Sequence, residues 1–357
     1  MRVIALANQK GGCGKTTTAV NLAAALARMG QQVLVIDSDP QGHATLALGL
    51  HEQDFSLSTY DLLLTSDVLV EDARVEVEPR LHLVPAGVEL SAVEARLAGV
   101  EGRENRLRDT LRRSDLAYDV ILIDCPPAVG ILTFNALLAS GEVIVPVDAS
   151  TYSRQAVTKL HETLDVLRDR RGHEVAVRLL LSNYDVRSRY ARSMREELGA
   201  VYGDTLLATI IHPTVRLREA AEHGIPVIDH DPRSRGARDF MDLAREVTDQ
   251  AVDLTVPALD HWTALLHGPE ITPEGVRFVA DFPRAKDVRL TGSFNDWSRQ
   301  GTPLYRREDG RWECVVPVQP GPHQYRFIVD GVWLPDPHNA HNVTNEFGGS
   351  NSLLQVS

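Results

Sequence analysis

Short runs of Val, Ile and Leu alternate with longer segments of helical period from residue 1 to about residue 255. The short runs predict strands at 2–7, 32–36, 119–123, 142–146 and 177–181. The longer segments predict helices at 17–29, 153–170, 191–198 and 236–254. Because the strands are apolar almost throughout, we expect both of their faces to be buried. The pattern predicts an α/β fold with a mostly parallel sheet flanked by helices.

The pattern changes after Leu254, where proline and glycine become frequent and the apolar runs become shorter. These runs predict strands at 276–280, 287–292, 312–316, 323–329 and 352–356. Asp309-Gly310 and Asp330-Gly331 are typical of hairpin turns. We therefore expect one domain at 1–255, a linker at 256–271, and a small all-β sandwich at 272–357.

Composition narrows the class of protein. The 357 residues carry a formal net charge of −12, which argues against a chain-wide electrostatic grip on nucleic acid but allows a local basic patch. No apolar run is long enough to span a membrane, and no secretory signal pattern follows Met1, so we expect a cytoplasmic protein. The spacing of Cys13, Cys125 and Cys314 fits neither a disulfide framework nor a zinc site.

A glycine-rich loop separates the first predicted strand from the first predicted helix, in the order that a P-loop requires. Backbone N–H groups of such a loop close on phosphate oxygens, while Lys15 can reach the β- and γ-phosphates and Thr16 can place its hydroxyl on Mg²⁺. The loop thus predicts a site for a nucleotide phosphate and Mg²⁺.

The loop, with its additional Lys10, is the deviant Walker A signature, and residues 1–255 resemble the ParA/Soj partition ATPases, a family that includes the MinD-like ATPases. Further motifs that carry the resemblance lie at 37–42, 121–127, 132–137, 215–220 and 229–237. The resemblance implies a P-loop NTPase that hydrolyses ATP slowly, with Lys10, Lys15 and Asp39 as catalytic residues. It implies ATP and Mg²⁺ as cofactors, with ATP bound by Lys10, Gly11, Gly12, Cys13, Gly14, Lys15, Thr16 and Thr17. It also implies that Thr16, Asp39 and Asp124 hold Mg²⁺.

The same resemblance implies a cycle of assembly. ATP favours a homodimer in which Lys10 of each subunit touches the partner's nucleotide, and hydrolysis returns the chain to the monomer. A ParB-like activator is an implied partner, and association with the nucleoid is the implied location. A MinD-like membrane helix would follow residue 255, where a second folded domain begins instead, so we expect no membrane binding.

Arginines slightly outnumber acidic residues between 178 and 245, in an otherwise acidic chain. The resemblance implies that a dimer binds DNA without sequence preference through Arg187, Arg189, Arg216 and Arg218. Phosphate contacts of this kind predict a steep dependence on salt. The alternative is a solvated surface whose arginines form ion pairs with neighbouring carboxylates.

Residues 290–297 and 322–333 carry a second resemblance, to the glycogen-binding module of the AMP-activated protein kinase β subunit. It implies an immunoglobulin-like early-set sandwich that binds α-glucan. By this resemblance Trp297 and Trp333 stack on pyranose rings, and Arg326 and Asn351 form polar contacts with the sugar. Arg326 stands where the family has lysine, and Phe347 stands where it has leucine.

Two interpretations of the C-terminal domain remain. In the first, the tryptophans cover the C–H faces of sugar rings, and the chain positions glycogen as its cargo. In the second, Trp297 and Trp333 pack in a core or a protein interface, and the sandwich is a protein-docking domain of a chromosome or plasmid partition ATPase.

Overall fold

The computed structural model describes residues 1–149, 153–249, 269–272, 275–280, 282, 285–307, 310–336, 339, 342–345 and 349–356. The chain divides into two compact units, Met1–Arg192 with Thr205–Leu254, and Ser193–Asp204 with Thr255–Ser357. Each unit is described by itself. Most of the expected linker, together with Phe347, lies outside the described residues.

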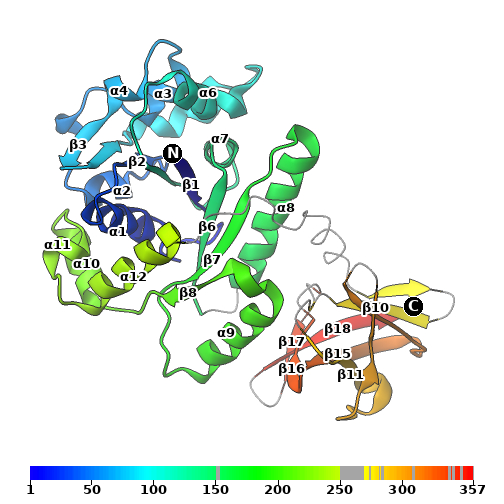
Figure 1. Cartoon of the computed structure of the whole chain (residues 1–357). Helices are drawn as coiled ribbons and strands as arrows, with labels where there is room; N and C mark the ends of the chain where they lie inside the picture. Colours follow the sequence, from blue (N-terminus) through cyan, green and yellow to red (C-terminus); the bar gives the residue numbers. More distant parts are fainter. Residues whose placement is uncertain are drawn as a thin grey trace. The chain divides into compact units, whose positions relative to one another are not determined.

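The first unit is built on an eight-stranded sheet of order β3-β4-β2-β5-β1-β6-β7-β8, as far as the described residues show (Figure 1). The strands are β1 (Arg2–Leu6), β2 (Val33–Asp37), β3 (Val75–Glu78), β4 (Leu81–Val84), β5 (Val120–Asp124), β6 (Glu142–Val147), β7 (Ala176–Leu181) and β8 (Leu206–Ile210). Only β3 runs antiparallel to its neighbour within this sheet. The expected mostly parallel sheet is confirmed.

Helices cover both faces of this sheet, with α1 and α12 on one side and α7 and α8 on the other (Figure 1). The helices of the chain are α1 (Lys15–Arg28), α2 (His43–Ala47), α3 (Thr59–Leu64), α4 (Val70–Ala73), α5 (Val93–Arg96), α6 (Arg106–Arg113), α7 (Ile131–Ala139), α8 (Ser153–Arg171), α9 (Arg189–Tyr202), α10 (Val215–Glu222), α11 (Val227–His230) and α12 (Arg235–Asp249), as far as the structure describes it. Among the described residues, no helix has the length and apolar character needed to cross a membrane.

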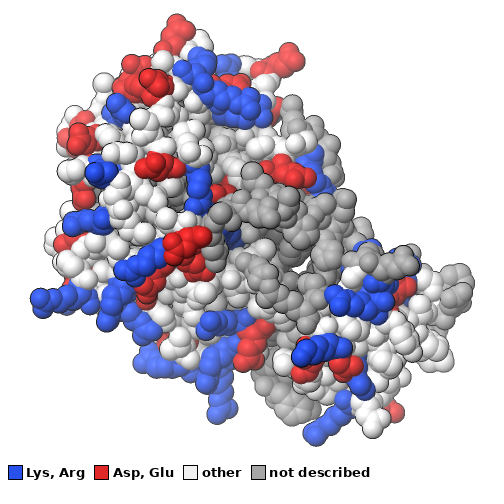
Figure 2. Space-filling model, viewed as in Figure 1, with Lys and Arg blue, Asp and Glu red and all other residues white. Residues whose placement is uncertain are grey.

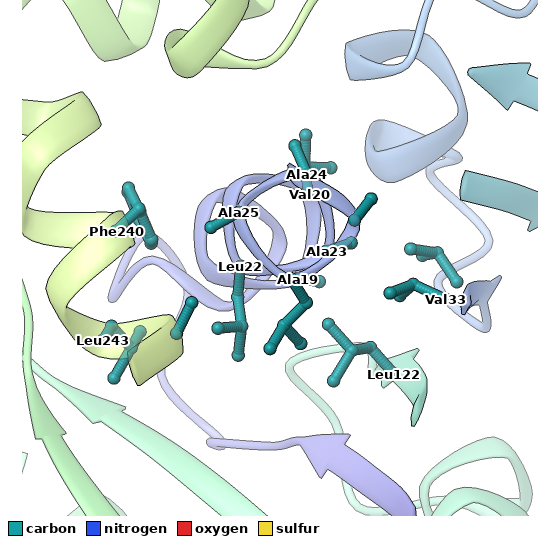
Figure 3. Packing of buried hydrophobic residues seen from close by; sticks show 14 of the residues in the cluster. Ala19, Val20, Leu22, Ala23, Ala24, Ala25, Val33, Leu122, Phe240 and Leu243 are labelled. Atoms are coloured by element: carbon teal, nitrogen blue, oxygen red, sulfur yellow. The ribbon is translucent and has the colours of Figure 1, made fainter. Parts of the chain in front are cut away.

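Helix α1 is buried on almost every side, which its alanine-rich sequence allows because small side chains let neighbouring elements approach closely. Figure 3 shows Phe240 and Leu243 of α12 against one side of this helix, and Val33 and Leu122 of the sheet near another. The helix that begins at the glycine-rich loop is therefore held rigidly between the sheet and α12.

Strand order determines where the polar residues at the strand ends meet. Strand β5 lies between β1 and β2, and its last residue, Asp124, pairs in register with both Leu6 and Asp37. The carboxyl ends of three parallel strands therefore meet beside the glycine-rich loop. This edge is where ligands bind in open α/β sheets.

The second unit contains a four-stranded sheet, β13-β14-β10-β9, and a second sheet, β12-β11-β15-β18-β17, with β16 paired to β15, among the described residues. Its strands are β9 (Glu270–Thr272), β10 (Gly275–Ala280), β11 (Val288–Gly292), β12 (Thr302–Pro303), β13 (Tyr305–Arg306), β14 (Trp312–Val316), β15 (Gly321–Val329), β16 (Val332–Leu334), β17 (Asn342–Thr344) and β18 (Ser350–Val356). Buried Phe278, Trp312 and Phe327 belong to one hydrophobic core. The antiparallel all-β sandwich is confirmed.

Candidate functional site

The glycine-rich loop needs glycine for backbone reasons at two positions. Gly12 and Gly14 have φ angles of 74° and 98°, in the left-handed region that side chains with a Cβ rarely adopt. A Cβ on Gly14 would also lie 2.5 Å from Oγ of Ser182. A Cβ on Gly11 or on Gly12 would meet nothing within 4 Å, so the loop is open on that side, as phosphate binding requires.

The two lysines of the loop lie in different environments. Lys15 is buried, and its Nζ donates to the carbonyl oxygen of Lys10 over 3.2 Å. The Nζ of Lys10 instead donates to the carboxylate of Asp148, 2.6 Å from Oδ1, just beyond the end of β6. Asn8 supports this arrangement because its Oδ1 accepts from the amide of Lys10. Sequence reasoning did not find Asp148, which matches no motif and becomes visible only through strand order.

Three carboxylates gather at the ends of β2 and β5. Asp37 and Asp124 are fully buried, and Asp39 is nearly so. Burial raises the pKa of Asp124 well above its usual range, and the neighbouring Asp37 raises it further. Burial also raises the pKa of Asp37 to about 6, although Thr45 donates to Asp37 from both its amide and its hydroxyl. Two buried carboxylates this close are costly without a cation.

The residues present fit a magnesium ion. Thr16 Oγ1 donates to Asp124 Oδ2 over 2.7 Å, which joins two of the expected metal-holding residues. The other carboxylate oxygen, Asp124 Oδ1, is buried with no hydrogen-bond partner among the described residues. A hard cation that prefers oxygen ligands would satisfy this atom. Asp39 lies on the loop that follows β2, where its Oδ1 accepts from the amide of Gln41.

The arginines expected to face DNA divide into two groups. Arg187 and Arg216 are exposed but already paired, Arg187 with Asp185, and Arg216 with Glu219 and Asp231. Arg189 and Arg218 are exposed, and among the described residues no ion pair to either is found. On the face shown in Figure 2, basic side chains gather over the region where Figure 1 places α10, α11 and α12.

In the second unit, Trp297 and Trp333 lie together. Their ring centroids are 6.5 Å apart, the planes differ by 23°, and both side chains are partly exposed rather than part of the core cluster. Arg326 lies on β15, and its guanidinium donates to the carbonyl oxygen of Trp333 over 2.5 Å. The structure therefore brings three of the four expected sugar contacts together.

Asn351, the fourth expected contact, is only 7% exposed. Its Nδ2 donates to Oε1 of Gln324 over 2.9 Å, and its Oδ1 accepts from Nδ2 of Asn345 over 3.0 Å. Sequence reasoning missed Gln324 and Asn345. The only available signal was the strand alternation that places Gln324 and Arg326 on the same face of β15.

Comparisons with known proteins agree with both units. A family model described as AAA domain matches residues 1–177, and a model described as glycogen recognition site of AMP-activated protein kinase matches residues 282–357. The sporulation initiation inhibitor protein Soj of Bacillus subtilis is 39% identical over 247 residues, which cover 69% of this chain and 98% of that protein. The chromosome partitioning protein ParA of Caulobacter vibrioides is 38% identical, covering 71% of this chain and 96% of ParA.

Solved structures give the same fold. Cobyrinic acid a,c-diamide synthase from Mycobacterium smegmatis, with bound ADP and magnesium, is 32% identical with a TM-score of 0.59, covering 74% of this chain and 96% of that one. The septum site-determining protein MinD of Pyrococcus horikoshii, complexed with Mg-ADP, is 26% identical with a TM-score of 0.55, covering 69% of this chain and 95% of MinD.

The loop, the buried lysine and the carboxylates at the strand ends define a P-loop ATPase, which hydrolyses ATP to ADP and phosphate and uses Mg²⁺. More narrowly, the chain belongs to the ParA/Soj family of partition ATPases and carries a C-terminal segment of the glycogen-recognition family.

Proposed function

We propose that this chain is an ATP-dependent dimerisation switch that hydrolyses ATP slowly, binds DNA non-specifically as a dimer, and positions an α-glucan such as glycogen. The observation that carries the proposal is the partly exposed Trp297–Trp333 pair on a chain whose other unit is a ParA-type ATPase. A nucleoid-associated location and a ParB-like activator of hydrolysis belong to the same proposal.

In the ATPase unit, we assign roles by position. Lys15 and the loop amides neutralise charge on the β- and γ-phosphates, and Mg²⁺ held by Thr16, Asp39 and Asp124 would add further positive charge there. Asp39 orients the water that attacks the γ-phosphorus, and ADP leaves with the bridging oxygen. With Lys10 paired to Asp148 in its own chain, the second lysine is absent from the partner's nucleotide until the dimer forms.

The dimer test compares Lys10→Ala with Lys159→Ala, an exposed lysine on α8, as a matched control. Lys10→Ala should remain monomeric with ATP because it removes the cation that reaches the partner's nucleotide. Lys159→Ala should dimerise like the unaltered chain, as measured by light scattering. An ATP-dependent dimer of Lys10→Ala would overturn the proposed interface.

The DNA test uses the difference between paired and unpaired arginines. Arg218→Ala should weaken ATP-dependent binding to a random duplex more than Arg216→Ala, because Arg216 already interacts with Glu219 and Asp231. Arg112→Ala, which removes an exposed arginine of α6 outside the 178–245 segment, is the control. Affinity measured by fluorescence anisotropy should fall steeply with added salt. A flat salt dependence would exclude binding through phosphates.

The glucan test uses the full chain, with titration of maltoheptaose followed by calorimetry. Replacing both Trp297 and Trp333 by alanine should abolish binding, since each ring covers the apolar face of a sugar. Tyr305→Ala removes an aromatic side chain that is 74% exposed on the other sheet, and it should bind as before. Equal binding by the double variant would exclude the tryptophan site.

The second candidate function, a protein-docking sandwich, has one observation in its favour. Asn351 is buried, and its amide nitrogen and oxygen are bonded to Gln324 and Asn345, so a sugar hydroxyl would have to compete with these bonds. If the folded chain binds neither maltoheptaose nor glycogen, this second function replaces the first.

A further inference from the structure

The loop that carries Trp297 has an unusual backbone. Asp296 and Trp297 have φ angles of 52° and 54°, so two consecutive residues with a Cβ adopt the left-handed conformation. Each such residue is less stable than in the ordinary conformation, and a bulky aromatic residue rarely adopts it. A conformation of this kind persists only where surrounding contacts impose it.

Asn295 supplies most of those contacts. Its Oδ1 accepts from the amide of Gly292 over 2.9 Å and lies 3.4 Å from the Thr291 hydroxyl. Its Nδ2 donates to the carbonyl oxygen of Leu290 over 3.2 Å. One side chain thus fastens the start of the loop to the end of β11, immediately before the two left-handed residues.

Backbone bonds close the loop around this side chain. The amide of Trp297 donates to the carbonyl oxygen of Gly292 over 3.0 Å. The amide of Ser298 donates to the carbonyl oxygen of Asn295 over 3.1 Å. A Cβ on Gly292 would lie 2.5 Å from the carbonyl oxygen of Gln324 on β15. The loop is therefore pressed against the sheet, with little room for another path.

Trp333 is held in place by strand pairing instead of by a loop. It lies on β16, paired in register with Ile328 of β15, and its carbonyl oxygen accepts from Arg326. Strand pairing thus positions Trp333, whereas Trp297 lies in the loop after β11, outside the strands.

We propose that Asn295 is a positioning residue of the glucan site, which holds the strained Trp297 backbone so that its indole lies beside Trp333 before any sugar arrives. This inference rests on the glucan-binding function proposed above. Rings aligned in advance lose little conformational entropy on binding, and the strain of the loop is the energetic cost of that alignment.

The test has a readout that does not depend on sugar. Two adjacent indoles give an exciton couplet in the far-ultraviolet circular dichroism spectrum, and Asn295→Ala should abolish it because the released loop relaxes to negative φ. Ser293→Ala is the matched control, since Ser293 lies on the same loop but bonds to His323 and Gln324 instead. Its couplet should match that of the unaltered chain.

Affinity provides the second readout. In the full chain, Asn295→Ala should weaken maltoheptaose binding at least about tenfold, which corresponds to about 1.4 kcal/mol, with the cooperative unfolding transition retained. Adding Asp296→Gly should restore part of the couplet and of the affinity, because glycine adopts the left-handed conformation without strain. If Asn295→Ala does not fold, Asn295→Asp, which keeps the acceptor for the Gly292 amide but removes the donor to the Leu290 carbonyl oxygen, should reduce both signals in part.

The outcomes distinguish the positioning role of Asn295 from the proposed glucan-binding function. A couplet that survives Asn295→Ala overturns the positioning role, whether or not the chain binds glucan. A couplet lost in Asn295→Ala, in a chain that never binds maltoheptaose, supports the positioning role of Asn295 for the tryptophan pair but overturns its assignment to a glucan site.

Discussion

Asp37 links the stability of the first unit to pH. It is fully buried, it ends β2, and it accepts from the amide and hydroxyl of Thr45 at 2.8 Å and 2.7 Å. Burial raises its pKa to about 6, so the folded chain holds a proton there that the unfolded chain releases at lower pH. The uptake of that proton links the stability of the chain to pH.

The sign of this dependence follows from the raised pKa. The contribution of Asp37 to the free energy of unfolding should be complete at pH below its ordinary value of 3.8 and should be lost as pH rises to about 6. Denaturant unfolding of the magnesium-free chain and of Asp37→Asn, compared at several pH values, checks this. The stability of the native chain relative to Asp37→Asn should fall across that window and stay constant above it. A difference that is constant throughout would show that Asp37 does not titrate on unfolding.

At the residue scale, sequence motifs predicted the loop lysines, Thr16, Asp39 and Asp124. They did not reveal Asp148 or Gln324. Motifs identify residues close together in the chain, whereas Asp148 meets Lys10 from 138 positions away. Gln324 likewise meets Asn351 only because β15 pairs with β18. Such contacts depend on register, which the sequence pattern left undetermined.

Among the elements, the close approach of two glycines joins α2 to the α10–α11 turn. A Cβ on Gly49 would lie 2.9 Å from the carbonyl oxygen of Gly224, and a Cβ on Gly224 would lie 2.9 Å from Cα of Gly49. Asn21 of α1 also accepts from the amide of Val227 at the start of α11. The helices that follow the nucleotide loops thus contact the segment that carries Arg216 and Arg218.

Gly49→Ala should destabilise the chain through backbone strain at a positive φ and through a clash with Gly224. Gly99→Ala measures the backbone strain alone. Gly49 and Gly99 have nearly equal φ angles of 79° and 76°, but nothing lies within 4 Å of a Cβ on Gly99. Gly99→Ala should therefore cost about 1 kcal/mol for backbone strain alone. Gly49→Ala should cost roughly 1–3 kcal/mol more, because the Gly224 backbone must move.

Urea unfolding of both variants measures this difference. Equal losses would mean that the α10–α11 turn moves aside without cost. A larger loss for Gly49→Ala would show that the contact between α2 and this turn is rigid.

The sequence predicted the elements unequally. The strands at 2–7, 119–123 and 142–146 were predicted because their residues are apolar nearly throughout. Strand β3, with residues Val-Glu-Val-Glu, was missed because this edge strand lacks that continuous apolar signal. Strand β8, with residues Leu-Leu-Ala-Thr-Ile, was missed although it is largely apolar. In the sandwich, β12 and β13 have two residues each and are too short to show any period.

For the whole molecule, we expect the two units to carry separable activities. Lys15→Ala should slow ATP hydrolysis by at least about 100-fold, since it removes the buried cation of the loop. It should leave glycogen binding unchanged. Conversely, the double alanine variant of Trp297 and Trp333 should lose glycogen binding and hydrolyse ATP at the original rate.

Phosphate release and co-sedimentation with glycogen measure the two activities on the same preparations. Tyr305→Ala again serves as the aromatic control, because Tyr305 is exposed on the other sheet, and it should retain both activities. Loss of both activities in either of the site variants would contradict separate sites.

The place of β5 between β1 and β2 has a consequence for protein synthesis. The P-loop emerges from the ribosome early, but Asp124, which bonds to Thr16 from 108 positions away, emerges much later. Until β5 has been translated, β1 and β2 lack the strand that joins them, and the carboxylate proposed to hold Mg²⁺ is absent. A nascent chain stalled before Val120 should therefore be unable to capture ATP, so the nucleotide cannot guide the folding of β1 to β4 and can act only after about half of the first unit has been translated.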